Sequence, residues 1–276
     1  MSTWLITGCS TGLGRALAGA VLAAGHYAVV TARDVSKVRE FEDEYPRTAL
    51  ALALDVTDPK QVVEAVAKTE ERFGAVDVLV NNAGYGYRAA VEEGSDDDIR
   101  KLFDTNFFGA VAMIKAVLPG MRARRAGAIV NISSMGAQGR PAGSGFYSAS
   151  KAALEGLTGS LQKELAPLGI SAMIVEPGAF RTDFAGRSLT QSAEAIADYA
   201  ETAGKRRIEN DTVHGTQQGD PARAAVAIIT AVESPEPPSL LLLGTDALDV
   251  FVRVSDSQRR ELEKWRELSA GTDYQT

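Results

Sequence analysis

Tyr147 and Lys151 stand four residues apart in the segment Tyr147-Ser148-Ala149-Ser150-Lys151. If this segment is helical, the spacing places a phenol and an ammonium on one face. A phenol ordinarily titrates near pH ~10, and a neighbouring positive charge favours its ionised form and lowers its pKa. The pair therefore predicts an acid/base site. The spacing alone also allows a solvated helix face on which the two residues have no chemical role.

A glycine-rich turn near the N-terminus predicts a dinucleotide site. Residues 4–7 form a short apolar run, and residues 15–24 have helical character. Between them the chain reads Gly8-Cys9-Ser10-Thr11-Gly12-Leu13-Gly14. A strand that enters such a turn and leaves it as a helix presents backbone N–H groups to a pyrophosphate. The spacing G-x3-G-x-G meets the general dinucleotide motif only in part, so a plain tight turn is the alternative.

Arg33 ends the second apolar run, 19 positions after Gly14. Near this offset an acidic residue binds the ribose 2′-hydroxyl of NAD, whereas a guanidinium matches the 2′-phosphate of NADP. Arg33 therefore favours NADP. The neighbouring Asp34 argues for NAD, because its carboxylate would repel a phosphate. A surface ion pair between the two residues is a third interpretation.

Later motifs join these two in a pattern that resembles a known family, the short-chain dehydrogenases/reductases. The motifs that carry the resemblance are Thr7-Gly8-x3-Gly12-x-Gly14, Asn81-Asn82-Ala83-Gly84, Asn106, Ser134, Tyr147-x3-Lys151 and Pro177-Gly178. They occur in the order and at the spacings of that family. The resemblance covers residues 2–182 closely and the remainder loosely.

The resemblance implies roles for the residues that could carry the chemistry. Ser134, rather than Ser133, would hydrogen-bond the substrate oxygen, and Tyr147 would donate the proton in reduction. Lys151 would hold the nicotinamide ribose and lower the pKa of Tyr147. Asn106 would help to form a water-linked proton relay. Preorganised donors of this kind stabilise the negative charge that develops when a hydride adds to a carbonyl.

The resemblance also implies a set of cofactor contacts, spread along the chain. They are Gly8, Ser10, Thr11, Gly12, Leu13 and Gly14 in the turn, Arg33, Asp55 and Val56 along the adenosine, Asn82, Ala83 and Gly84 along the ribose side, Tyr147 and Lys151, and Pro177, Gly178 and Thr182 at the nicotinamide end. Members that use NADP often carry a basic residue just before the second glycine of the turn, where this chain has Thr11. The expectation of NADP, with NAD as the alternative cofactor, therefore depends on Arg33.

Short apolar runs alternate with longer amphipathic segments. Strands are predicted at 3–7, 27–31, 49–53, 77–81, 127–132, 170–175 and 239–243, and helices near 12–24, 36–44, 58–73, 98–124, 147–166 and 220–233. This alternation predicts an α/β fold with a doubly wound parallel sheet, Rossmann-like, with about seven strands and helices on both faces. Ligands bind such sheets beyond the carboxyl ends of the strands, and most of the candidate residues follow strand ends.

The bulk composition narrows the class of protein. The chain has 276 residues, 45% of them hydrophobic, which suits a single domain over 1–276, and the resemblance makes 183–219 a substrate lid. A net charge of −7 provides no basic field for nucleic acid or an anionic membrane. A single cysteine excludes an internal disulfide and fits a reducing compartment. With no signal sequence and no run of eighteen apolar residues, we expect a cytoplasmic protein without a metal.

The function expected from the sequence is an oxidoreductase that transfers a hydride between NADP(H) and a carbonyl or secondary alcohol. The same chemistry with NAD(H) and a non-catalytic dinucleotide-binding redox sensor are the alternatives. By resemblance, a homodimer or homotetramer forms through helices 98–124 and 147–166. Four aromatic residues near the site loops form either an apolar substrate wall or part of the core: Tyr85, Tyr87, Phe180 and Phe184. The amphipathic run 255–268 is either a packed terminal helix or a subunit contact.

Overall fold

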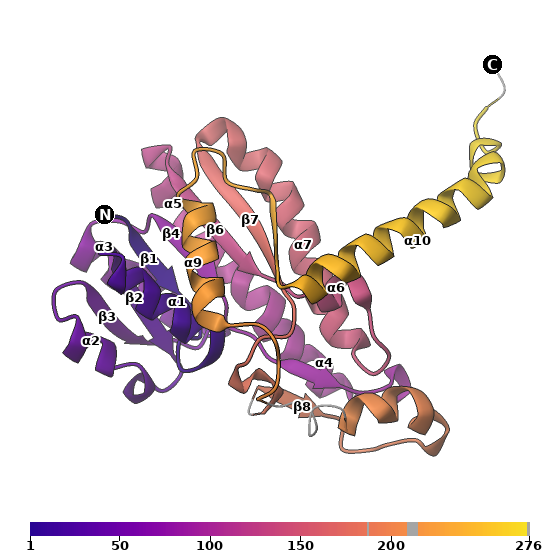
Figure 1. The fold of residues 1–276 in the computed structure, drawn as a ribbon. Helices are drawn as coiled ribbons and strands as arrows, with labels where there is room; N and C mark the ends of the chain where they lie inside the picture. Colours follow the sequence, from indigo (N-terminus) through magenta and orange to yellow (C-terminus); the bar gives the residue numbers. More distant parts are fainter. Residues whose placement is uncertain (187, 209–214, 275–276) are drawn as a thin grey trace.

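A parallel sheet of seven strands forms the centre of the protein in the computed structural model, which describes residues 1–186, 188–208 and 215–274 (Figure 1). The strands are β1 (Thr3–Ile6), β2 (Tyr27–Ala32), β3 (Ala49–Ala53), β4 (Val78–Asn81), β6 (Gly127–Ile132), β7 (Ile170–Pro177) and β9 (Leu240–Leu243). Their order is β3-β2-β1-β4-β6-β7-β9, so the chain reverses its direction of winding between β1 and β4. The predicted fold class is confirmed, and the switch point marks where a ligand binds in such sheets.

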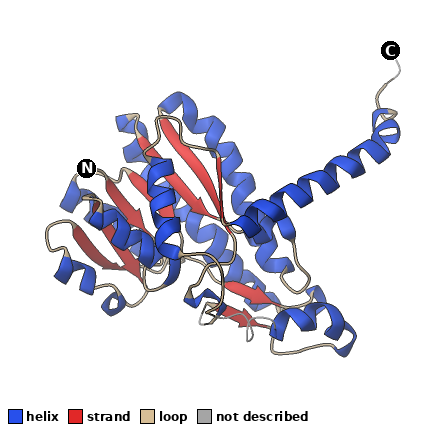
Figure 2. Ribbon diagram, in the orientation of Figure 1, coloured by secondary structure: helices blue, strands red, loops and turns tan. Residues whose placement is uncertain are grey.

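Successive residues of the central strands pack into two different cores, because side chains alternate between the faces of a strand. Trp4 and Ile6 of β1 lie in the core that includes the buried faces of α1 (Gly12–Ala23) and α9 (Pro221–Val232). Leu5 lies in the opposite core. That core is completed by α3 (Pro59–Phe73), α5 (Ala110–Arg124) and α7 (Gly145–Leu165). Figure 2 shows the resulting helix–sheet–helix layers.

Two predicted helices differ from a regular α-helix. The segment expected at 36–44 divides into a 3₁₀ turn, Val35–Lys37, which Asp34 caps, and the short helix α2 (Glu40–Glu44). The helix expected at 98–124 is continuous, but it consists of α4 (Asp96–Phe103), a π-helical segment at Asp104–Gly109, and α5. Short π-helical segments inside α-helices are frequently found at functional sites. This one contains Asn106.

The continuous helix Asp96–Arg124 is, among the described residues, the one helix long and apolar enough to cross a membrane. Of its most apolar window, 39% is buried inside the protein. A single helix of this length and composition is weak evidence for a membrane span, because the core helices of soluble proteins can be equally long and apolar.

A second, two-stranded parallel sheet was not predicted. It pairs β5 (Gly86–Arg88) with β8 (Leu189–Gln191), and so ties the segment after β4 to the proposed lid. The short helix α6 (Met135–Gly139) was also missed. The remaining described turns of helix are Val91–Glu93, Ala166–Leu168, Asp183–Ala185, Ala197–Tyr199, the π-turn Ala200–Gly204 and the helical residues 205–208.

The C-terminal helix α10 (Thr245–Ala270) begins ten residues earlier than the amphipathic run at 255–268 indicated. Near its start it packs on α6, and the rest extends away from the body of the protein (Figure 1). Leu262, Trp265 and Leu268 on the extended part are exposed. The second half of α10 is therefore not a helix packed on the core of its own chain.

Candidate functional site

A cavity of about 1310 Å³ lies at the carboxyl ends of the sheet strands. Of the predicted site residues it is lined by Gly8, Ser10, Thr11, Gly12, Leu13, Arg33, Asp55, Val56, Asn82, Ala83, Gly84, Ser134, Tyr147, Lys151, Pro177, Gly178 and Thr182. Gly14 and Asn106 are the two predicted residues that do not line it. The fold thus brings segments from β1 to β7 to one place, as the strand-end positions predicted.

The glycine turn has the geometry of an anion cradle. Gly8 and Gly12 have φ angles of +73° and +65°, a region that favours glycine. A Cβ on Gly14 would overlap the Asn82 side-chain amide and would come within 2.6 Å of the Gly8 carbonyl oxygen. Thr11 gives α1 no side-chain cap, which leaves the first N–H groups of the helix available to a ligand. These residues fit the pyrophosphate of a dinucleotide.

Hydrogen bonds hold the segment after β4 against this turn. Thr7 Oγ1 accepts from the backbone N–H groups of Asn82 and Ala83, each at 2.9 Å. The Asn82 side-chain amide donates to the carbonyl oxygens of Thr7 at 2.8 Å and Gly8 at 3.0 Å. The two motifs therefore form one rigid wall of the cavity, made by the ends of β1 and β4.

The side chains of Arg33 and Asp34 have different surroundings. Arg33 is exposed and lines the cavity at the end of β2. The Asp34 carboxylate accepts hydrogen bonds from Ser36 N at 3.0 Å and Ser36 Oγ at 2.7 Å, and these bonds lower its pKa. Asp34 thus caps the following turn, and the basic residue of the pair is the one at the cavity wall.

Tyr147 is buried, with 8% of its surface exposed, and its hydroxyl interacts with Ser134. Burial raises the pKa of Tyr147, while the interaction with Ser134 and the positive charge of Arg88 act to lower it. The Phe184 ring lies 5.8 Å from the Tyr147 ring, centroid to centroid. The phenol is therefore protonated at neutral pH, and its ring lies against Phe184.

Lys151 is anchored to the sheet. Its Nζ atom donates to the Ile132 carbonyl oxygen at 2.8 Å and lies 6.0 Å from the Tyr147 ring centroid. Burial lowers the pKa of Lys151 to about 8, and the Glu155 carboxylate opposes that shift. The expectation that Lys151 lowers the pKa of Tyr147 needs correction. The net shift of Tyr147 is upward, and the lowering influences come from Ser134 and Arg88.

Asn106 lies behind the cavity wall, 1% exposed, within the π-helical segment. Its Oδ1 accepts from Tyr85 N at 3.0 Å, and its Nδ2 donates to Tyr85 O at 2.9 Å and Ser150 Oγ at 3.2 Å. A Cβ on Gly84 would lie 3.0 Å from Asn106 Oδ1 and 3.4 Å from Lys151 Nζ. Asn106 is therefore close to the ammonium, and its place in a proton relay stays a prediction.

A model of the family described as short chain dehydrogenase matches residues 2–193. The chain belongs to the short-chain dehydrogenase family.

Relatives agree with this assignment over nearly the whole length. Oxidoreductase BOA17 of Botryotinia fuckeliana is 36% identical over 267 residues, which are 96% of this chain and 97% of that protein. The crystal structure of a short-chain dehydrogenase from Streptomyces avermitilis has a TM-score of 0.92 and 44% identity, over 99% of this chain and 100% of its own. An alcohol dehydrogenase from the archaeon Thermococcus sibiricus, complexed with 5-hydroxy-NADP, has a TM-score of 0.70 and 26% identity. The match covers 88% of this chain and 95% of that protein.

The predicted enzyme class, an NAD(P)-dependent dehydrogenase or reductase, is confirmed by these similarities. The alternative of a non-catalytic redox sensor is therefore set aside. Among the described residues of this short-chain dehydrogenase, no cluster of three or more His, Cys, Asp or Glu side chains could hold a metal ion.

Arg88 is a site residue that the sequence did not reveal. It lies on β5 at 7% exposure, lines the cavity, and donates to the Ser144 hydroxyl. Its charge acts on Tyr147 by lowering the pKa of the phenol. A three-residue strand has too short a pattern to predict. The one available signal was a basic residue shortly after the Asn81–Gly84 motif.

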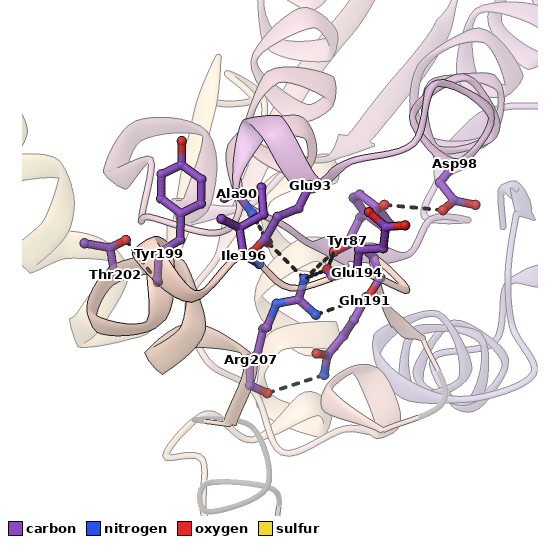
Figure 3. A network of polar contacts seen from close by, with 11 residues as sticks. Tyr87, Ala90, Glu93, Asp98, Gln191, Glu194, Ile196, Tyr199, Thr202 and Arg207 are labelled. Atoms are coloured by element: carbon purple, nitrogen blue, oxygen red, sulfur yellow. Dashed lines mark hydrogen bonds and ion pairs between the residues drawn. The ribbon is translucent and has the colours of Figure 1, made fainter.

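A buried ion pair ties the proposed lid to the body of this dehydrogenase (Figure 3). Arg207 Nη2 lies 2.9 Å from Glu93 Oε2, and Arg207 Nη1 donates to the Ser192 carbonyl oxygen at 3.1 Å. Glu93 also accepts from Ala90 N at 2.7 Å and Ile196 N at 2.8 Å. Burial alone would raise the pKa of Glu93, but these hydrogen bonds and Arg207 hold it below its ordinary value.

The four aromatic residues left undecided by the sequence, Tyr85, Tyr87, Phe180 and Phe184, all line the cavity. Tyr87 is 1% exposed and also belongs to a small core cluster, whereas Phe184 is 37% exposed and faces Tyr147. Tyr85, Tyr87 and Phe180 therefore pack against core clusters and also line the cavity, whereas Phe184 is at the cavity alone. Asp246, Val250 and Arg253 of α10 complete the rim.

Proposed function

We propose that this short-chain dehydrogenase interconverts a carbonyl compound and a secondary alcohol with NADP(H), and that Tyr147 is its general acid/base. One observation carries the proposal. Ser134, Tyr147 and Lys151 line the same cavity as the glycine turn. A redox cofactor and an acid/base group at one site are what a reversible hydride transfer with proton exchange requires.

The choice of NADP is supported by the end of β2. Arg33 offers a guanidinium to a 2′-phosphate, whereas the Asp34 carboxylate is engaged by Ser36. The alcohol dehydrogenase from Thermococcus sibiricus, whose complex contains 5-hydroxy-NADP, gives related support. The turn residues Gly8 to Gly14 would hold the pyrophosphate, and Asp55 and Val56 would lie along the adenine.

The protonation state of Tyr147 suits the reducing direction. Because burial raises its pKa, the phenol is protonated at neutral pH and donates a hydrogen bond to a carbonyl oxygen. Ser134 supplies a second donor to the same oxygen, so that the developing negative charge is stabilised. When it is bound, the reduced nicotinamide supplies the hydride. After Tyr147 has given up its proton, the Ser134 hydroxyl and the Arg88 charge stabilise the phenolate.

The remaining cavity surface favours an apolar substrate. Phe184 lies beside Tyr147, and Tyr85 and Phe180 line the same cavity. Rings of this kind provide a large apolar contact with a cyclic or alkyl group. We propose a ketone, an aldehyde or a secondary alcohol with such a group, under a lid formed by 183–219, of which residues 187 and 209–214 lie outside the described part.

We further propose that the enzyme is a cytoplasmic homo-oligomer joined through α4, α5 and α7. Phe108, in the π-helical segment between α4 and α5, is 55% exposed and would be covered in such an assembly. Sedimentation at working concentration tests this, because a monomer would contradict it.

The function itself is tested by following NADPH oxidation over a panel of ketones and aldehydes, and NADP⁺ reduction over secondary alcohols. We expect turnover with at least one apolar substrate, and slower turnover when NADH replaces NADPH. If NADPH binds but no member of a broad panel is turned over, the proposed reaction is wrong. If turnover is faster with NADH, the reaction stands but the proposed cofactor is wrong.

A further inference from the structure

Beneath the proposed active site, two glutamate side chains accept hydrogen bonds from one amide group, the Nε2 of Gln138. Glu155 lies on α7, one helical turn after Lys151, and Glu176 lies on β7, immediately before Pro177. Glu176 is only 1% exposed. Two ionised carboxylates held this close can only accept hydrogen bonds, and they repel each other. A proton on one of them removes that repulsion.

The surrounding groups fix this pair in place. Gln138 Nε2 donates to Glu155 Oε2 at 3.2 Å and to Glu176 Oε1 at 3.4 Å. The hydroxyl of Ser133, which precedes Ser134, donates a hydrogen bond to Glu155 Oε1. The pair thus joins the end of β6, α6, α7 and the end of β7, the four elements that carry the proposed chemistry.

Charge balance favours a single shared proton. The positive charge of Lys151, one turn earlier on α7, favours the ionised form of Glu155. The negative charge of Glu155 in turn favours the protonated form of Glu176. With both carboxyls ionised, two negative charges, one of them on the buried Glu176, would face one ammonium. With both protonated, the ammonium would have no counter-charge. One proton on the pair leaves one negative charge for one positive charge, the least costly arrangement away from water.

We propose that Glu155 and Glu176 share one proton and act as a positioning pair, whose single negative charge keeps the Lys151 ammonium charged. Glu155 is the nearer member and carries most of this effect, while Glu176 holds the proton. The pKa shifts agree with this assignment. Burial raises the pKa of both carboxyls, and the charge of Glu155 adds to the shift of Glu176, whose pKa is about 7. The consequence for cofactor binding depends on the proposed function, but the shared proton does not.

Two measurements without cofactor test the pair. Infrared spectroscopy at neutral pH detects the carbonyl stretch of a protonated, buried carboxylic acid, and NMR of lysine-labelled protein follows the titration of Lys151, assigned with Lys151→Met. The variants are Glu155→Gln and Glu176→Gln. Glu164→Gln is the matched control, because Glu164 is an exposed glutamate on the same helix.

We expect wild type and Glu164→Gln to show the protonated acid, and both other variants to lose it, since the remaining glutamate then ionises. Glu155→Gln lowers the Lys151 midpoint by about one pH unit or more, whereas Glu176→Gln leaves it unchanged or raises it. No acid band in wild type, a band that persists in both variants, or equal Lys151 midpoints would overturn the proposal. Because neither readout uses NADP(H), failure of the pair is distinguishable from failure of the proposed reaction.

Discussion

The Nζ atom of Lys151 donates a 2.8 Å hydrogen bond to the carbonyl oxygen of Ile132, at the end of β6. Ile132 precedes Ser134 by two residues, so this bond fixes the ammonium at the edge of the sheet, 6.0 Å from the centroid of the Tyr147 ring. Burial lowers the pKa of Lys151 from 10.5 to about 8. A charge that titrates this close to neutrality makes the site sensitive to pH.

We predict that the affinity for NADPH falls as the pH rises through 8, because Lys151 loses its charge there. Lys151→Met removes this dependence and weakens binding at pH 7 by about tenfold. Titration of NADPH fluorescence across this range measures both effects. Binding that is as pH-dependent in Lys151→Met as in wild type would show that another group is responsible.

The same shift affects stability with a defined sign. Between about pH 8 and 10.5 the unfolded chain keeps a proton on Lys151 that the folded chain has released. The contribution of this group to the free energy of unfolding therefore rises with pH over that window. Comparison of chemical denaturation of wild type and Lys151→Met isolates it.

Arg207→Ala is predicted to loosen the proposed lid, because it leaves the Glu93 carboxylate buried without its cation. Loss of one partner of a buried pair costs about 3 kcal/mol or more. We expect faster hydrogen exchange in residues 189–208 and a KM for the carbonyl substrate raised about tenfold, with NADPH affinity nearly unchanged.

Lys205→Ala is the matched control for the lid. Its pair with Glu201 is exposed, and such pairs contribute about 0.5 kcal/mol or less. Equal exchange rates and KM values in the two variants would mean that the Glu93–Arg207 pair has no special role in closing the cavity.

Arg33→Ala is predicted to abolish the preference for NADP. Loss of a charged hydrogen bond to a 2′-phosphate weakens NADPH binding by about tenfold or more and leaves NADH binding within about twofold. Calorimetry with both cofactors measures this. In contrast, Asp34→Ala keeps the preference, since that carboxylate caps the next turn. A strong gain in NADPH affinity in Asp34→Ala would place the carboxylate at the phosphate instead.

Gly14→Ala is predicted to distort the glycine turn. The new Cβ would overlap the Asn82 amide and come within 2.6 Å of a backbone oxygen, and backbone cannot yield cheaply. We expect NADPH affinity to fall by about tenfold and the free energy of unfolding by about 1–3 kcal/mol. In the control Gly156→Ala, an added Cβ meets no atom within 4 Å in helix α7, so stability is kept or gained by about 0.5–1 kcal/mol.

The sequence predicted well those features that repeat over several residues or that belong to a linear motif. The seven sheet strands are apolar runs with flanking turns, and each is found near its predicted position. The cavity residues at strand ends follow from the topology, because parallel strands place their carboxyl ends at one edge. Arg33 could be selected for the same reason.

Features that depend on contacts between distant segments could not be predicted. The strands β5 and β8 have three residues each, and their pairing joins positions about a hundred residues apart. Glu93 pairs with Arg207, and Glu155 lies next to Glu176. From the sequence alone, each of these charged residues would be placed on the surface. The sequence predicted a lowered pKa for Tyr147, whereas burial raises it. The spacing between Tyr147 and Lys151 contains no information on burial.

The central claim is that the Tyr147 hydroxyl exchanges the proton during hydride transfer. Tyr147→Phe removes that oxygen and keeps the ring that lies against Phe184. With a substrate found in the panel, we expect kcat to fall by about 10²- to 10⁴-fold. NADPH affinity, measured in the same preparation, should stay within about twofold of wild type. Retention of most of the rate in Tyr147→Phe would contradict the account.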